Sequence, residues 1–254
     1  MVRIIDWKET PGGKPAFCGY KNPKSSCYTS KKEWIKQEEE KHGLVHKLLY
    51  SDEHGAAGGI EYLPGEYAWR PVEVSGYMFI TCVYIMKKDY KGSGYGLRLL
   101  EACETDAESA GLSGVAAVTR KGSWLAGKEL FEKAEYSAAD TAPPDYELMV
   151  KTFKPAPPPR FKPDRDDPGQ VYVNGVHILY SHQCPYLAKS VPEMAEAAQK
   201  EFGITPELHV IESPEEARKN PAFYGTFSVI IDGRICEDRP ISKSRFLNIL
   251  KKEL

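Results

Sequence analysis

Residues 90–107 of the chain read YKGSGYGLRLLEACETDA, in which three glycines come directly before a helical pattern. Leu100, Cys103 and Ala107 recur at the spacing of one helix face. The first N–H groups of a helix lack partners within the helix and carry partial positive charge, and glycines let the backbone close around an anion. The stretch therefore predicts a phosphate cradle. An ordinary glycine-rich turn between a strand and a helix is the alternative that these residues leave open.

The spacing of Gly92, Gly94 and Gly96 argues against the common nucleotide folds. A dinucleotide fold has G-x-G-x-x-G and an acidic residue at ribose distance after a clear strand, whereas this turn is G-x-G-x-G without that residue. A P-loop ends in Gly-Lys-Ser/Thr, which the turn lacks. The phosphate ligand is therefore expected to be of another kind.

The composition is that of a soluble globular protein. The 254 residues carry a net charge of −2, which gives no general electrostatic case for nucleic acid. No apolar run is long enough for a membrane span, and the N-terminus is too polar for a signal peptide. The six cysteines are scattered and lack the spacing of a metal site. We therefore expect reduced thiols, a cytoplasmic location and no metal.

A proline-rich, charged segment at residues 154–170 is typical of a linker. It predicts two domains, at residues 1–153 and 171–254. In the first, strands are expected at residues 58–63, 76–86, 113–121 and 146–153. Helices are expected from Lys31 onward, after the glycines and over residues 124–134. The second reads as strand, helix, strand, short helix, hairpin at Asp232-Gly233, and helix. The fold class is therefore α/β (α+β).

Several segments of the chain together resemble a known superfamily. The segment YIMKKDYKGSGYGLRLL is similar to the acyl-CoA-binding segment of GNAT acetyltransferases, whose pattern begins with Arg or Gln where this chain has Lys91. An aromatic-Glu-Lys-x-x-aromatic pattern follows at residues 131–136. Together with CGYKNP and IEYLPGEYAWRP, these segments resemble GNAT proteins that carry a YoaP-like C-terminal domain, over nearly the whole chain.

The resemblance implies a mixed, mostly antiparallel sheet flanked by helices, with acetyl-CoA as cosubstrate. Pantetheine would pair with the backbone of the VYIM strand, and the pyrophosphate would lie on the glycine turn. The cofactor-binding residues that it implies are Ile85, Met86, Lys91, Gly92, Ser93, Gly94, Tyr95, Gly96 and Phe131.

Acetyl transfer needs a group that takes a proton from the amine, a donor that stabilises the oxyanion, and an acid for the leaving thiolate. Glu61 is the first candidate base, and a backbone N–H within residues 84–86 is the expected oxyanion donor. His54, Glu66 and Glu73 are the reserve bases. The alternative that the sequence leaves open is that Glu61 is a solvent-exposed strand residue without a catalytic role.

Relatives often protonate the thiolate with a tyrosine at the position of Phe131, which cannot donate. Tyr84, Tyr95 or Tyr136 is then expected to replace it, with Tyr84 and Tyr136 as our first choices. Water as the proton donor and a departure from the family's chemistry stay open.

The second domain contains HQCPYLAK between a strand and a helix, which resembles a thioredoxin-like active-site turn. Cys184 is present, but Leu187 stands where relatives have the resolving cysteine, and Phe227 stands where they have a cis-proline. A second site at Cys184 and Phe227 is therefore expected to bind or pack rather than to exchange disulfides.

These observations predict an acetyl-CoA-dependent N-acetyltransferase for a small amine or amino-acid-like acceptor, without nucleic-acid or membrane partners and with a homodimer left open. The alternative is a non-catalytic or regulatory protein that binds CoA or a thiol ligand.

Overall fold

The structure, a computed structural model, describes residues 1–13 and 15–254. It divides into two compact units. Unit 1 comprises Met1–Pro23, Ile35–Ala68 and Val72–Phe161, and unit 2 comprises Lys24–Trp34, Trp69–Pro71 and Lys162–Leu254. The predicted domain boundaries at residues 153 and 171 stay a prediction. Within the segment expected to be a linker, β9 (Arg160–Phe161) belongs to unit 1, where it pairs with β4 (Val72–Glu73).

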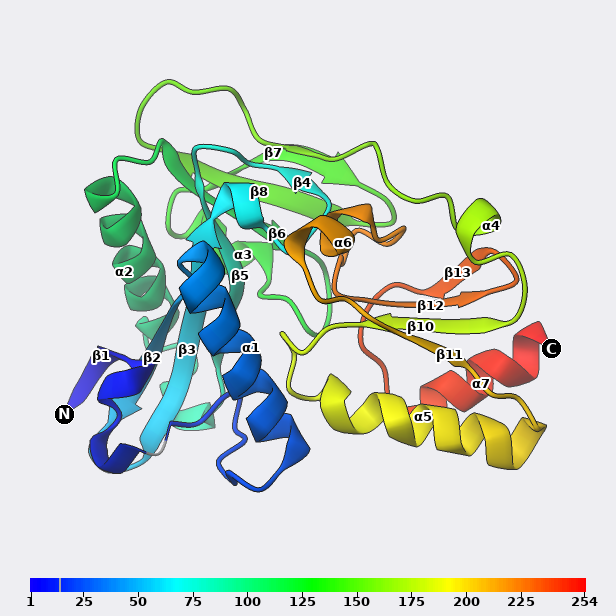
Figure 1. The fold of residues 1–254 in the computed structure, drawn as a ribbon. Helices are drawn as coiled ribbons and strands as arrows, with labels where there is room; N and C mark the ends of the chain where they lie inside the picture. The colour runs from blue at the N-terminus through cyan, green and yellow to red at the C-terminus, as the bar shows by residue number, and fades with distance from the viewer. Residues whose placement is uncertain (14) are drawn as a thin grey trace. The chain divides into compact units, whose positions relative to one another are not determined.

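Unit 1 is built on a seven-stranded sheet in the order β1-β2-β3-β5-β6-β8-β7 (Figure 1). Neighbouring strands are antiparallel except β5 and β6, which run parallel. The strands are β1 (Val2–Asp6), β2 (Val45–Ser51), β3 (Gly55–Pro64), β5 (Met78–Ile85), β6 (Gly114–Thr119), β7 (Ser137–Ala142) and β8 (Tyr146–Thr152). The expected mixed, mostly antiparallel sheet is confirmed.

One face of this sheet packs against α2 (Tyr95–Ser109). The helix buries Leu99, Leu100, Cys103 and Ala107, which share one face because they lie three or four residues apart. They meet a cluster from the sheet that includes Leu49, Ile60, Tyr62, Ile80 and Met149. This apolar core fixes the helix that follows the glycine turn.

Short elements complete unit 1. They are the 3-10 turns η1 (Trp7–Glu9), η2 (Pro11–Gly13), η3 (Gly65–Tyr67) and η4 (Lys88–Tyr90), and the helix α3 (Lys128–Glu132). Helix α1 (Ser26–His42) contributes its first half to unit 2 and its second half to unit 1. Its buried side chains, among them Lys31, Ile35 and Glu38, again follow helical spacing.

Unit 2 contains a four-stranded sheet in the order β11-β10-β12-β13. The strand β10 runs parallel to β11 and antiparallel to β12, and β12 forms a hairpin with β13. The elements are α4 (Pro168–Val171), β10 (Val176–Tyr180), α5 (Leu187–Phe202), β11 (Glu207–Val210), α6 (Pro214–Lys219), β12 (Phe227–Ile231), β13 (Arg234–Glu237) and α7 (Lys243–Glu253). The predicted hairpin at Asp232-Gly233 is confirmed, since both residues have positive φ.

Residues far apart in the sequence hold unit 2 together. Buried Lys31 donates from Nζ to the Gln183 carbonyl at 2.6 Å. Arg70, also buried, donates to the Tyr224 carbonyl, and its guanidinium lies 4.5 Å from the centre of the Tyr224 ring. Gly225 permits this approach, because a Cβ there would lie 2.7 Å from the Arg70 Cα. The short segments Lys24–Trp34 and Trp69–Pro71 are therefore an integral part of unit 2.

The helix predicted over residues 124–134 is wrong for most of its length, because α3 spans only Lys128–Glu132. Trp124 has φ of 83° and Gly127 is extended, so neither can continue a helix. The strands β1, β2 and β7 and the short strands β4 and β9 were not predicted. The sequence of β7, SAADTA, is small and polar, and its residues are mostly exposed. Its place in the sheet depends on pairing with β8 rather than on an apolar pattern of its own.

No helix in the described part of the chain is long and apolar enough to cross a membrane.

Two glycines of unit 1 give a matched stability test. A Cβ at Gly114 would lie 2.2 Å from the Lys151 carbonyl oxygen, and the β6–β8 pairing leaves that backbone no room to move. A Cβ at Gly127 would meet only the exposed Glu129 carboxylate, at 2.4 Å, which can rotate away. We expect Gly114→Ala to lower the free energy of unfolding in urea by about 1–3 kcal/mol. Gly127→Ala should change it by less than about 0.5 kcal/mol, and equal losses would contradict this account.

Candidate functional site

The two central strands of unit 1 separate after a short parallel contact. Within the described residues, β5 pairs with β6 only through Met78–Ile80, opposite Val115–Ala117. The register between β3 and β5 also shifts at this point, since Glu61 faces Cys82 while Tyr62 faces Ile80, which leaves Thr81 as a β-bulge. Residues 82–85 are half-buried. Beyond the bulge, the edge of β5 that faced β6 is therefore open.

The hydrogen bonds to β3 show which amides face this open edge. The Met86 N–H donates to the Ala57 carbonyl at 2.9 Å and is thus directed towards β3. Because successive N–H groups of a strand point to opposite sides, the Ile85 N–H is directed away from β3. Of the two residues predicted to pair with pantetheine, Ile85 offers its amide to an added chain, and Met86 uses its amide within the sheet.

The glycine turn follows β5 and η4 and leads into α2. Residues 91–94 are exposed, and Gly92 and Gly94 have φ of 75° and 78°, a region that favours glycine. Gly94 is the N-cap of α2, and nothing lies within 4 Å of a Cβ built at Gly92 or Gly94. The turn thus presents accessible backbone at the N-terminus of a 15-residue helix. A glycine at position 96 is favoured for a different reason, namely close packing, because an added Cβ would lie 2.9 Å from the Leu130 Cδ1.

Aromatic side chains support the turn. The Tyr90 and Tyr95 rings lie 5.5 Å apart, and the Tyr90 hydroxyl lies 2.9 Å from His54 Nδ1. The Arg98 guanidinium lies 5.5 Å from the centre of the Tyr95 ring. Arg98 therefore adds a positive charge in the first turn of α2, beside Lys91 and Ser93 in the exposed loop. Arg98 was not predicted, although its place one helical turn after Tyr95 was visible in the sequence.

Glu61 lies on β3 and is fully buried, which excludes the solvated strand residue that the sequence left open. Its Oε1 lies 3.8 Å from Nδ1 of His46, the residue opposite it on β2, which is also fully buried. The Phe17 ring lies 5.6 Å from the His46 ring. Lys47, the next residue on β2, reaches Asp106 of α2 at 2.8 Å, so His46 and Glu61 occupy the opposite face of the sheet. His46 was not predicted as a site residue.

Tyr84 lies close to Glu61, on the neighbouring strand. Its hydroxyl accepts a hydrogen bond from the Cys18 N–H at 3.3 Å. Burial, followed by the proximity of Cys18, Glu61 and Cys82, holds the pKa of the Tyr84 phenol well above its usual range. Gly59, opposite Tyr84, leaves the space for this side chain, because a Cβ there would lie 2.9 Å from the Tyr84 hydroxyl. The structure therefore gathers a carboxylate, a protonated phenol and an imidazole.

Tyr136 and Phe131 lie elsewhere. Both belong to the buried cluster on the α2 face, where their ring centres are 5.4 Å apart in an edge contact. Burial, followed by Cys103 and Glu104, raises the pKa of Tyr136. Tyr136 is thus on the opposite face of the sheet from Glu61, and Phe131 packs in the core.

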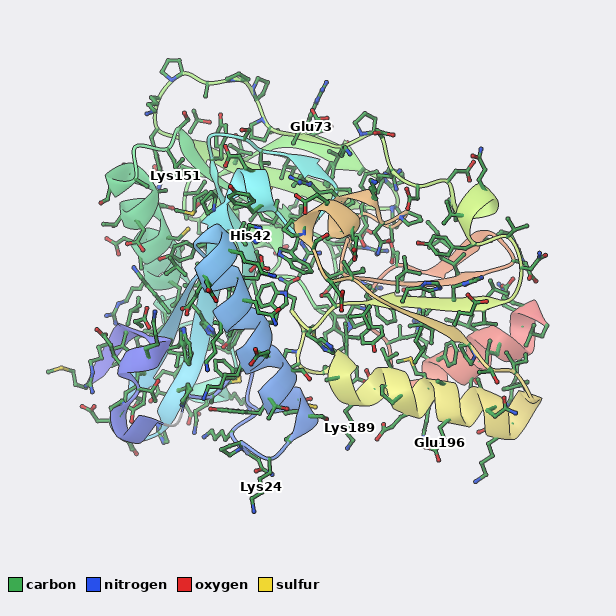
Figure 2. The ribbon with its side chains drawn as sticks, viewed as in Figure 1. Lys24, His42, Glu73, Lys151, Lys189 and Glu196 are labelled. Atoms are coloured by element: carbon green, nitrogen blue, oxygen red, sulfur yellow. The ribbon has the colours of Figure 1, made fainter. Side chains whose placement is uncertain are left out.

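The three reserve bases have other partners. Glu66 accepts hydrogen bonds from the Ser75 hydroxyl at 2.7 Å and the Gly76 N–H at 2.8 Å. Glu73, labelled in Figure 2, binds Arg160 Nε at 2.5 Å. His54 contacts Tyr90 beside the glycine turn, as described above. None of these contacts links the three residues to Glu61.

In unit 2, Cys184 is half-buried and its carbonyl accepts the Leu187 N–H at 3.1 Å, at the start of α5. Phe227 is fully buried at the beginning of β12, opposite Tyr180. Phe227 is therefore part of the core of unit 2 and does not line an accessible surface beside Cys184. All six cysteines of the chain are free thiols.

The comparisons with known proteins identify the family. The chain is 32% identical over 223 residues to the uncharacterized N-acetyltransferase YoaP of Bacillus subtilis (strain 168). The aligned region covers 87% of this chain and 86% of the relative. A search of protein-family models found no match. Identity at this level over most of both chains shows common descent. The chain belongs to the YoaP family of N-acetyltransferases.

Solved structures resemble the chain more distantly. The PaiA N-acetyltransferase of Thermoplasma acidophilum, in complex with coenzyme A, has a TM-score of 0.38 and 15% identity, covering 48% of this chain and 68% of its own. A GNAT-family acetyltransferase of Staphylococcus aureus Mu50 has a TM-score of 0.39 and 11% identity, covering 61% and 100%. With TM-scores this low, neither the binding site nor the substrate of these proteins can be assigned to this chain.

The contact between His46 and Glu61 predicts energetic coupling. We expect Glu61→Gln and His46→Leu each to lower the free energy of unfolding, because each leaves a buried polar partner behind. The double variant should lose less than the sum of the single losses, by at least about 0.5 kcal/mol. Urea unfolding of the four proteins measures this difference. Lys151→Met is the control, because Lys151, labelled in Figure 2, forms an ion pair with Glu104 of α2 on the other face of the sheet. Its effect on the free energy of unfolding should be additive with that of Glu61→Gln.

Proposed function

We propose that this chain is an acetyl-CoA-dependent N-acetyltransferase that acts on a small amine or amino-acid-like acceptor by direct attack on the thioester. One observation carries the proposal: the open edge of β5 leads through η4 into an accessible glycine turn at the N-terminus of α2. A strand edge can pair with the amides of pantetheine, and a helix N-terminus favours a phosphate. Membership of an N-acetyltransferase family supports the same conclusion.

The residues present fit acetyl-CoA, which supplies an activated acetyl thioester. The Ile85 N–H faces the open edge, as argued above, and is our candidate to pair with the pantetheine arm. The amides of residues 92–96 would hold the pyrophosphate, since Gly92 and Gly94 place no Cβ over the backbone. The Lys91 N–H already donates to the Lys88 carbonyl at 3.0 Å. Lys91 and Arg98 would add positive charge beside it.

Glu61 and Tyr84 are our candidates for proton transfer. Glu61 would take the proton of the amine, with His46 at 3.8 Å holding its carboxylate in place. Tyr84, whose raised pKa keeps its phenol protonated at neutral pH, would return a proton to the leaving thiolate. A backbone N–H near Ile85 would stabilise the oxyanion. Burial of Glu61 beside Tyr84 supports this choice over Tyr136, which lies on the other face of the sheet.

The non-catalytic alternative has one observation in its favour. Phe131, which stands where relatives often have a tyrosine proton donor, is buried in the core. A protein that binds CoA without turnover would need no donor there. Measured turnover decides between the catalytic and the non-catalytic function.

We also propose that unit 2 is a thioredoxin-like domain. The strand order β11-β10-β12-β13, with α5 connecting the parallel strands β10 and β11, supports this proposal.

The glycine turn gives a test of CoA binding. We expect Gly94→Ala to weaken acetyl-CoA binding at least about 10-fold in calorimetry, because alanine is strained at φ of 78° and distorts the cradle. Gly111→Ala is the matched control, since Gly111 has φ of 70° and equally open space just beyond the other end of α2. It should lose similar stability and retain the affinity. Equal affinity in both variants would place the pyrophosphate elsewhere.

The catalytic proposal is tested with a panel of small amines. Glu61→Gln should lower kcat by about 10²–10⁴-fold, because an amide cannot accept the amine proton. The affinity for acetyl-CoA should stay within a few-fold of the original value, and exposed Glu40→Gln should retain full activity. Unchanged kcat in Glu61→Gln would assign the base to another group. Tight CoA binding without turnover of any amine would favour the non-catalytic alternative.

A further inference from the structure

We propose that unit 2 contains a binding site for a divalent transition metal, formed by His177, Glu207 and His209. His177 lies on β10, and the other two residues lie on the parallel strand β11. His177 and Glu207 face each other in the register, and His209 follows Glu207 by two positions, so all three side chains share one face of the sheet. They come together across a strand-helix-strand connection, although 30 and 32 residues separate them from His177.

The three ligand atoms are spaced as a metal ion requires. His177 Nδ1 lies 3.1 Å from His209 Nε2 and 3.5 Å from Glu207 Oε2, and the last two atoms are 3.9 Å apart. In a triangle with these sides, the point equidistant from the three atoms lies about 2 Å from each. Zinc binds histidine nitrogen and carboxylate oxygen at about 2.0–2.2 Å. The site therefore needs only small side-chain movements to close around an ion.

A second observation concerns the tautomer of His177. Its Nε2 lies 2.8 Å from the Asn174 carbonyl oxygen, which can only accept, so Nε2 carries the hydrogen. Neutral His177 then has its free lone pair on Nδ1, the atom that faces His209 and Glu207. Metal-binding histidines commonly donate their other N–H to a backbone carbonyl in this way. The Tyr172 ring makes edge contacts with both imidazoles, and its centre lies 5.3 Å from the centre of the His177 ring and 5.5 Å from that of the His209 ring.

The donor set indicates which ion fits. Two imidazoles and one carboxylate suit zinc, whereas calcium and magnesium prefer oxygen ligands. Three protein ligands leave a fourth tetrahedral position for water or a further ligand. His177 is buried, but the side chains of His209 and Glu207 are 37% and 68% exposed, so the ion would exchange with solvent. It would also link β11, at the edge of the sheet, to β10.

No metal was expected from the sequence, because the cysteines lack the spacing of a metal site and the two histidines of this cluster lie 32 positions apart. Without an ion, the two imidazoles form a hydrogen bond in which His209 Nε2–H donates to His177 Nδ1. That hydrogen bond alone is the competing explanation of the cluster, and the experiment below separates the two.

The test is a titration of the reduced 254-residue chain with zinc against a chromophoric chelator, together with thermal unfolding with and without zinc. Zinc should bind stoichiometrically and raise Tm, because it binds only the folded arrangement of these ligands. His209→Asn should weaken this site at least about 10-fold and abolish the rise in Tm. Glu207→Gln, an exposed change, should weaken it as well. Both variants leave buried His177 in place and change more exposed side chains, so we expect the fold to be retained, and Tm without zinc checks this.

His42→Gln is the control, since His42 (Figure 2) pairs with Glu38 of α1 and lies outside the cluster. It should bind zinc like the unaltered chain. The six thiols can also bind zinc, but their contribution is the same in every variant. Equal affinity and an equal rise in Tm in His209→Asn and the unaltered chain would overturn the proposal. Absence of stoichiometric binding at micromolar free zinc would overturn it too, and would leave the hydrogen bond as the role of the two imidazoles.

Discussion

The separation of β5 from β6 after Ile80 is the constraint on which the candidate site depends. A sheet normally satisfies every amide of a central strand, and an edge that opens in the middle of a sheet must be filled by water or by another chain. The bulge at Thr81 changes the direction of β5 at this point. Because β5 leads through η4 into the glycine turn, one stretch of chain presents both an open strand edge and a helix N-terminus, as the acetyl-CoA site that we propose requires.

The two faces of the unit 1 sheet carry different kinds of side chain. The α2 face carries an apolar cluster that includes Phe131, Cys103 and Leu100 and fixes the helix and hence the turn before it. The other face carries His46, Glu61 and Tyr84 under cover of the N-terminal segment around Phe17. Buried polar groups are costly to desolvate, and the proton-transfer roles that we propose for Glu61 and Tyr84 would give a reason to retain them.

Local patterns allowed much of this fold to be predicted. The strand, the turn and the helix over residues 76–109 follow from apolar runs, from glycines that take positive φ and from helical spacing. Predictions failed where the information is not local. The partner of Glu61 depends on the register between β2 and β3, which no pattern within either strand reveals. The pairing of His177 with His209 likewise requires the connection through α5. Tyr84 and Tyr136 have the same residue type, and only the sheet places them on opposite faces.

The make-up of unit 2 has a consequence for how the protein is made. Lys31 and Gln183 are 152 positions apart, and Arg70 and Tyr224 are 154 positions apart, yet both contacts are buried within this unit. Closing such long loops costs entropy before any contact forms, and it slows folding. During synthesis the first part of α1 leaves the ribosome long before the strands that unit 2 requires. The nascent chain must therefore carry the buried side of that helix, including Cys27 and Tyr28, without its native cover until the strands of unit 2 have been synthesised.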